Sequence, residues 1–117
     1  MYEKPDYYAK LAKQEGYPAR SVYKLKEIDE KNGLVKPGMN ILDIGAAPGS
    51  WSAYCMRKQK DRGRIVAVDP APVEVKKDKG GRFVAIEGDI LKEETRNRIL
   101  EYAPFELVLS DAAPPTT

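Results

Sequence analysis

Four short apolar runs, spaced along the part of the chain after residue 40, constrain the fold more than any other feature. They are Ile41 to Ile44, Ile65 to Val68, Phe83 to Ile86 and Leu107 to Leu109, and their starts are separated by 24, 18 and 24 residues. Parallel strands must be joined by crossovers of about a dozen residues or more, usually containing a helix, and each interval has room for one. The sequence therefore predicts an α/β fold with a parallel sheet.

Helices are expected in the crossovers and ahead of the first strand. The crossover segments are 52–59, the short 73–79, and 93–102, which ends before Pro104. Ahead of the sheet, one helix should follow Pro5, and another should begin at Ser21, a favourable N-cap, and stop at Gly33. With 117 residues the chain has the size of a single domain, in which residues 1–33 form an N-terminal helical segment.

The helix that begins at Ser21 should pack one face against the sheet. Val22, Leu25 and Ile28 recur at helical spacing and are expected to form that buried face. Lys24 lies near two of them on the helical wheel, so it is expected to border the core.

Five tyrosines in or just after the N-terminal segment are interleaved with lysines and arginines. Aromatic rings beside cations can stack on bases and hold phosphates. The same rings can instead pack a small helix onto the domain, and nearby acids almost cancel the basic charge. The sequence does not choose between these readings. The tyrosines are Tyr2, Tyr7, Tyr8, Tyr17 and Tyr23.

The stretch from Asn40 to Trp51 passes from the first strand through a glycine turn into a helix. Gly45 permits a sharp exit from the strand, and Gly49 lets a ligand approach the backbone. The free N–H groups of the following helix point over the end of the strand. We therefore expect a small ligand at the carboxyl edge of the sheet.

The turn lacks features that a dinucleotide pyrophosphate needs. It is not a G-x-G-x-x-G, because Ala47 stands at the position of the second glycine, and Asp43 places a negative charge just before the turn. An acid favours a cation, and S-adenosylmethionine (SAM) carries an ammonium, a sulfonium and a carboxylate that suits the helix N-terminus. The alternative is that Asp43 only braces the loop through hydrogen bonds.

An acid stands at or just beyond the end of each predicted strand. Asp69 is placed to hold ribose hydroxyls, as carboxylates do in nucleoside-binding α/β sheets. Asp89 can accept from an adenine amino group, and Asp111 can face the transferable end of the ligand. Each acid alone could be a cap or turn residue. The four are Asp43, Asp69, Asp89 and Asp111.

Composition excludes several classes of protein. The single Cys55 cannot form an internal disulfide, and without histidine there is no cluster of soft metal ligands, so we expect no structural metal site. No apolar run approaches membrane-spanning length and the N-terminus lacks a signal peptide's apolar core, so a cytoplasmic location is expected. The net charge of +2 does not by itself indicate nucleic acid. A basic cluster after the glycine-turn helix is interpreted as a solvated face: Arg57, Lys58, Lys60, Arg62 and Arg64.

Three motifs resemble those of the FtsJ or RrmJ family of SAM-dependent RNA ribose 2'-O-methyltransferases. Residues 19–28 read ARSVYKLKEI and resemble the family's R-[SA]-x-[YF]-K-L segment. Residues 42–52 read LDIGAAPGSWS and resemble its SAM motif, with Ser50 where glycine is common. Residues 110–114 read SDAAP and resemble the family's S-D-x-A-P motif. The resemblance implies a Rossmann-like methyltransferase fold with the first four strands in the order 3-2-1-4.

The resemblance also implies roles for individual residues. Cofactor contacts fall on Gly49, Trp51, Asp69, Asp89 and Asp111. Of the family's Lys-Asp-Lys-Glu tetrad, Lys24 and Asp111 are present, while the second lysine and the glutamate belong to later strands. Lys24 would tune the base or hold a phosphate beside the target, unless it only pairs with Glu27 on its own helix. We therefore expect the N-terminal part of a longer domain.

The implied partner is RNA, with residues 1–33 on the RNA-facing side. Large-subunit ribosomal RNA or a ribosomal subunit is the first expectation, and transfer RNA is the next. Two alternatives stay open from the sequence. One is a SAM-binding or RNA-binding module without catalysis, and the other is a nicotinamide-dependent dehydrogenase, which the loop chemistry disfavours.

Overall fold

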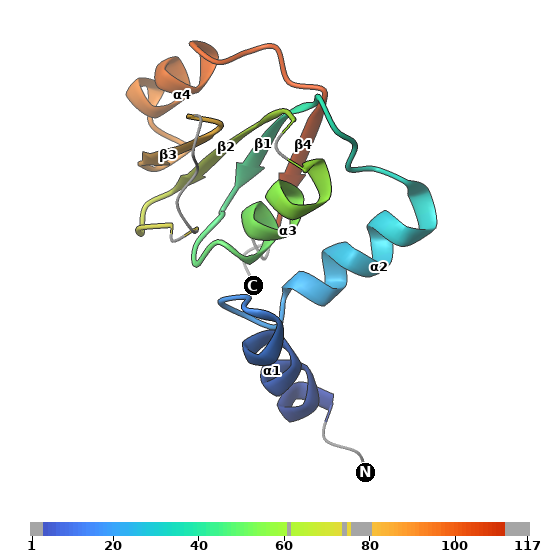
Figure 1. The fold of residues 1–117 in the computed structure, drawn as a ribbon. Coiled ribbons are helices and arrows are strands. Elements are labelled where there is room, and N and C mark those ends of the chain that lie inside the picture. Colours follow the sequence, from blue (N-terminus) through green and yellow to red (C-terminus); the bar gives the residue numbers. More distant parts are fainter. Residues whose placement is uncertain (1–3, 61, 74, 76–80, 112–117) are drawn as a thin grey trace.

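A computed structural model describes residues 4–60, 62–73, 75 and 81–111 of the chain. Its helices are α1 (Lys4–Glu15), α2 (Val22–Asn32), α3 (Ser50–Gln59) and α4 (Glu93–Leu100). Its strands are β1 (Asn40–Ile44), β2 (Arg64–Asp69), β3 (Phe83–Glu87) and β4 (Leu107–Ser110). Figure 1 shows α3 lying across one face of the sheet with α2 beside it, while α1 extends away from the sheet.

The four strands form one parallel sheet, as the apolar runs predict, in the order β3-β2-β1-β4 that the family resemblance implies. The register pairs Ile41 of β1 with Ile65 of β2 on one side and with Leu107 of β4 on the other. Because all strands run the same way, their carboxyl ends meet at one edge.

Both faces of the two central strands, β1 and β2, are covered, which explains why these strands read as apolar runs. Side chains alternate between the faces. Ile41 and Ile65 pack with α2 and α3 in one core cluster, which also holds Trp51 and Cys55. A second cluster packs the other face against α4; its members are Leu42, Val66, Val68, Ile86 and Ile99.

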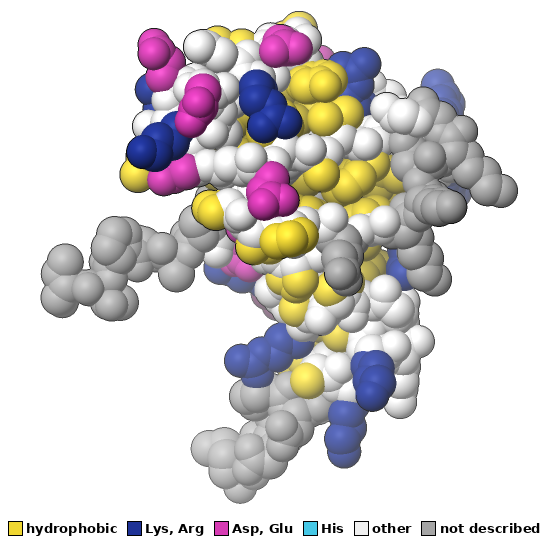
Figure 2. All heavy atoms as spheres, turned by 90° about the vertical axis from the view of Figure 1, so that its left-hand side faces the viewer, with side chains coloured by type: hydrophobic (Ala, Val, Ile, Leu, Met, Phe, Trp, Pro, Cys, Tyr) yellow, Lys and Arg dark blue, Asp and Glu magenta, His cyan; other side chains and the backbone are white. Residues whose placement is uncertain are grey.

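The α4 side of the molecule retains apolar surface. Figure 2 shows hydrophobic side chains gathered on one face among scattered charged ones. Leu91, Leu100 and Val108 are the most exposed large hydrophobic side chains of the described residues.

The face that α2 buries differs from the expected one. Val22 and Leu25 are buried as predicted, but Ile28 is 38% exposed and Asp29 is only 2% exposed. The expectation for Ile28 was wrong because Asp29 occupies the seam with α3, where its carboxylate is hydrogen-bonded. Lys24 is exposed and does not border the core.

The ends of the helices differ from the expected ones in detail. Ser21 precedes α2 but makes no side-chain capping hydrogen bond, whereas Gly33 ends α2 in the left-handed conformation, with its N–H donating to the Asp29 carbonyl. The helix α3 begins two residues earlier than expected, and α4 ends at Leu100. Most of the helix expected at 73–79 lies outside the described residues.

Candidate active site

The glycine turn after β1 is held against the end of β2. Gly45 has a φ of 71°, and its N–H donates to the Val68 carbonyl at 2.9 Å. The Ala47 N–H donates to Oδ2 of Asp69 at 3.1 Å. Gly49, with a φ of 119°, then leads directly into α3. Both glycines adopt backbone conformations that other residues rarely tolerate, so the turn is fixed by its sequence.

Asp69 orders two loops at the carboxyl edge. Besides the bond from Ala47, its Oδ1 accepts from the Ala71 N–H at 2.8 Å. A carboxylate has about four acceptor sites, so bonds to two backbone groups leave capacity for a further donor such as a ribose hydroxyl. Asp89 is similar: its Oδ1 accepts from the Leu91 N–H at 2.9 Å, just beyond β3.

Asp43 is the most deeply buried acid of this edge, with 1% of its surface exposed. Ser52 donates a hydrogen bond to its Oδ2 at 2.7 Å. This contact agrees with the alternative that Asp43 braces the loop through hydrogen bonds. The pKa of Asp43 is raised to about 6: burial is the largest cause, the Ser52 hydrogen bond opposes the rise, and the charges of Asp111 and Asp69 add to it. A direct contact between Asp43 and a cofactor stays a prediction.

The carboxylates at this edge interact electrostatically. Asp111 and Asp69 are close enough for their charges to act on Asp43. Like charges gathered around a buried acid are unfavourable, and a bound cation offsets that repulsion. A ligand with a sulfonium and an ammonium fits this set, and the first turn of α3 adds backbone N–H groups for its carboxylate. The residues present therefore fit SAM chemically.

Lys24 and Asp111 meet at the same edge although they are far apart in sequence. Lys24 Nζ on α2 lies 3.4 Å from Oδ1 of Asp111, which follows β4, and their side chains are 66% and 30% exposed. At this distance the contact is an ion pair with at most a weak hydrogen bond. The pairing joins Lys24 to Asp111, not to Glu27 on its own helix.

The N-terminal end of α2 is fastened to the start of α3. Ser50 Oγ accepts from the Ala19 N–H at 2.7 Å and donates to the Ala19 carbonyl at 3.2 Å. The indole N–H of Trp51 donates to the Ser21 carbonyl at 2.9 Å. Trp51 is buried in the core beside α2. This structural role accounts for Trp51, and its expected contact with the cofactor stays a prediction.

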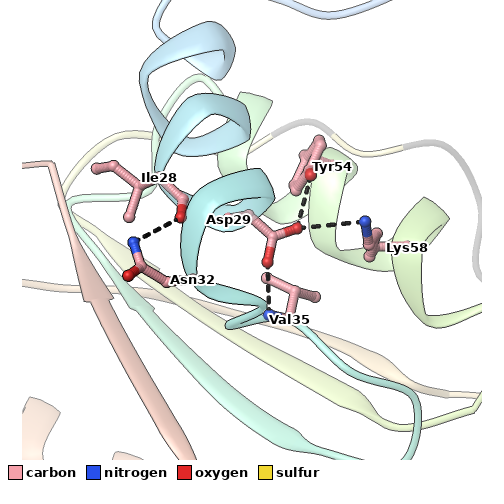
Figure 3. A network of polar contacts seen from close by, with 6 residues as sticks. All are labelled: Ile28, Asp29, Asn32, Val35, Tyr54 and Lys58. Carbon is pink, nitrogen blue, oxygen red and sulfur yellow. Dashed lines mark hydrogen bonds and ion pairs between the residues drawn. The ribbon is translucent and has the colours of Figure 1, made fainter.

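The C-terminal half of α2 is fastened to α3 by a buried network that the sequence reading missed (Figure 3). Asp29 accepts from the Tyr54 hydroxyl at 2.7 Å and from the Val35 N–H at 2.8 Å, and Lys58 Nζ lies 3.5 Å away. Burial alone would raise the pKa of Asp29, but these hydrogen bonds and the Lys58 charge hold it below its ordinary value. The sequence did hold a signal for the burial of Asp29, because Asp29 follows the buried Leu25 at i+4 and so lies on the same face of α2.

Tyr2 lies outside the described residues, and the other four N-terminal tyrosines pack with one another or with neighbouring side chains. The ring centroids of Tyr8 and Tyr23 are 5.3 Å apart, and those of Tyr7 and Tyr8 are 5.1 Å apart. The Tyr23 hydroxyl donates to Glu15. Tyr23 therefore packs the N-terminal helix onto the domain, which is the second of the two alternatives, while Tyr7 remains 55% exposed.

The described residues contain neither a cluster of metal ligands nor a membrane-spanning helix. There, no group of three or more His, Cys, Asp or Glu side chains is arranged to hold a metal ion. Among the same residues, none of the helices has the length and apolar character needed to cross a membrane.

Comparisons with known proteins agree with this geometry. The family model described as FtsJ-like methyltransferase matches residues 17–117. Ribosomal RNA large subunit methyltransferase E of Sorangium cellulosum is 44% identical over 116 residues, which are 99% of this chain and 53% of that protein. The protein of the same name from Borrelia garinii is 48% identical over 117 residues, which are 100% of this chain and 59% of that protein.

A solved structure is similar as well. A ribosomal RNA methyltransferase from Plasmodium falciparum aligns with a TM-score of 0.68 and 31% identity, covering 86% of this chain and 58% of that one. The chain spans somewhat more than half the length of the two curated relatives, 53% and 59%.

Proposed function

Because this chain belongs to the FtsJ-like methyltransferase family, we propose that it forms the cofactor-binding part of an enzyme that transfers a methyl group from SAM to a ribose 2'-hydroxyl of RNA. The observation that carries the proposal is the carboxyl edge of the sheet, where Lys24 lies 3.4 Å from Asp111 and the charges of Asp111 and Asp69 act on buried Asp43.

The cofactor roles follow from the position of each residue. Asp69 ends β2 and would hold the ribose, and Asp89 lies just beyond β3 and would hold the adenine amino group. Asp43 would attract the cationic part of SAM, and Asp111 would lie beside its methyl end. Gly45 and Gly49 shape the turn, and Trp51 fixes the start of α3 and borders the site.

The chemistry requires placement and charge at the target hydroxyl. Bound SAM supplies a methyl group activated by a sulfonium. A ribose hydroxyl must lose its proton as it attacks, so a base and close placement are needed. The exposed Lys24 ammonium would hold the phosphate beside the target or tune the base, and Asp111 would orient Lys24 through the ion pair. The second lysine and the glutamate of the family's tetrad are not among these 117 residues, so transfer is proposed for the whole protein.

Ribosomal RNA is the substrate we favour over transfer RNA, because the relatives are named for ribosomal RNA. Residues 1–33 would contribute to the RNA-facing side, since α2 carries Lys24. We also propose that the protein is cytoplasmic.

Calorimetric titration of the chain with SAM tests the cofactor assignment. We expect SAM to bind and Asp69→Ala to weaken binding by about 1–3 kcal/mol, the usual loss of a hydrogen bond to a charged group. Glu27→Ala, which removes an exposed acid from α2, is the matched control and should leave the affinity unchanged. NAD is the competing ligand, and tight NAD binding without SAM binding would overturn the proposal.

A further inference from the structure

A hollow of about 470 Å³ lies beside the C-terminal end of α3, on the side of the molecule formed by α2 and α3. It combines cationic and aromatic side chains and belongs to the region that the sequence reading interpreted as a solvated face. Its lining residues are Tyr17, Pro37, Tyr54, Arg57, Lys58 and Lys60. We call it the basic groove.

The basic groove is separate from the candidate active site. The helix α3 begins at the glycine turn and ends ten residues later at Gln59, next to the groove. A helix rises about 1.5 Å per residue, so Lys60, ten residues beyond Ser50, lies about 15 Å from the start of α3 along the helix axis. A ligand at the carboxyl edge of the sheet therefore does not fill the groove.

Arg57 is held in position by neutral partners. Its Nη1 donates to the Glu15 carbonyl at 2.8 Å, and its guanidinium carbon lies 4.2 Å from the centroid of the Tyr17 ring. Carbonyl groups and an aromatic face orient the guanidinium without cancelling its charge. The Glu15 carboxylate accepts from the Tyr23 hydroxyl. Arg57 thus presents a fixed positive charge beside an aromatic ring.

The two lysines of the groove differ in how their charge is balanced. Lys58 lies 3.5 Å from the buried Asp29 carboxylate, which offsets one of the positive charges, yet 47% of the Lys58 side chain remains exposed. Lys60 follows the end of α3 with a φ of 49° and is exposed. The groove therefore keeps a positive excess, although the whole chain has a net charge of only +2.

We propose that the basic groove is a second RNA contact, which binds the phosphate backbone at a distance from the methylated nucleotide. Cations that track phosphates, with aromatic rings among them, are the common composition of RNA-binding surfaces. A backbone phosphate that reaches the groove would therefore belong to a nucleotide a short distance along the strand from the methylated one. The groove then adds affinity and fixes the direction of the strand that enters the active site. This inference rests on the proposed function, which supplies RNA as the partner.

Binding of a fluorescein-labelled transcript of large-subunit ribosomal RNA, measured by anisotropy at several salt concentrations, tests the proposal. Lys60→Gln keeps the side-chain length and removes the charge. We expect it to weaken RNA binding about three- to tenfold at low salt and to reduce the slope of log K against log salt by about 0.7–0.9, the value for one lost phosphate contact. Lys60→Arg should retain both properties.

Arg98→Gln is the matched control, because it removes one positive charge from α4 on the other face of the sheet. A loss as large as that of Lys60→Gln would show that only the overall charge counts and would overturn the proposal. Wild-type affinity and salt slope in Lys60→Gln would overturn it too. As a measurement on the unmodified protein, bound RNA should protect Lys60 from amine acetylation, and equal labelling with and without RNA would contradict the proposal.

SAM titration of the same samples separates the two proposals. SAM binding that is equal in all variants, with RNA binding lost only in Lys60→Gln, supports the groove. A chain that binds SAM but not RNA refutes the groove and leaves the cofactor assignment standing. A chain that binds neither refutes the proposed function.

Discussion

Replacing Asp43 by asparagine should stabilise the fold while weakening the binding of SAM. The Asp43 carboxylate is almost completely buried and has a pKa of about 6, compared with an ordinary value of 3.8. A raised pKa means that the folded state binds the proton more tightly than the unfolded state. Stability therefore falls as pH rises from about 4 to about 6, and the full cost is present above pH 6.

The size of the effect follows from the shift. About two pKa units at about 1.4 kcal/mol each give a cost of about 3 kcal/mol at pH 8. Asparagine has nearly the same shape and can still accept the hydrogen bond from Ser52. Its amide N–H groups need partners of their own, which offsets part of the gain. We expect the free energy of unfolding to rise by about 1–3 kcal/mol at pH 8, with little or no gain at pH 4.

Urea unfolding of both proteins between pH 4 and pH 8 measures this difference, and the contribution of titrating groups that do not interact with Asp43 cancels. Glu87→Gln, which neutralises an exposed acid at the end of β3, is the control and should change stability little at any pH. An Asp43→Asn protein no more stable than the wild type at pH 8 would refute the reasoning. A gain that is the same at pH 4 would also refute it, because the effect would then not arise from the charge.

Three more outcomes are expected. In a form of the protein that methylates RNA, Lys24→Ala should lower the rate of transfer far more than SAM affinity, and equal losses would make Lys24 structural. Tyr54→Phe should lower the free energy of unfolding by about 1–3 kcal/mol in urea titration, since Asp29 loses a buried donor; no loss would show that the bond is dispensable. Gly63→Ala should lower the melting temperature, because a Cβ would lie 2.5 Å from Gln59 Nε2 at a φ of +122°; an unchanged melting temperature would show that the turn adapts.

The sheet could be predicted from the sequence because its signals are local and repeated. Each strand is an apolar run, and each interval has room for a crossover helix, which favours the parallel arrangement. Its order, 3-2-1-4, came from the resemblance to a family and is confirmed. The meeting of Lys24 with Asp111 was also implied by that resemblance, and no periodicity in the chain could have placed a residue of α2 beside the end of β4.

The packing of α2 was predicted less well because it depends on what the helix meets. Ile28 and Asp29 are adjacent, and hydrophobicity favours burying the isoleucine. Asp29 is buried instead of Ile28 because the Tyr54 hydroxyl and the Val35 N–H donate to its carboxylate between α2 and α3. The basic cluster interpreted as a solvated face is exposed, but two of its members also have partners. Lys58 lies beside Asp29, and Arg57 donates to the Glu15 and Gly16 carbonyls at the end of α1.

The two attachments of α2 make α3 the element on which the remaining geometry depends. Ser50 and Trp51 hold the chain just before α2, and Tyr54 holds Asp29 near its end. Lys24 lies between these attachments, so the position of its ammonium relative to Asp111 is set by α3. The glycine turn, where the cofactor is proposed to bind, leads into the start of α3, and the end of α3 borders the basic groove. In the proposed complex, a strand of RNA at the groove would contact the same helix that fixes α2 and Lys24, so a contact about 15 Å from the start of α3 would help select the nucleotide that is methylated.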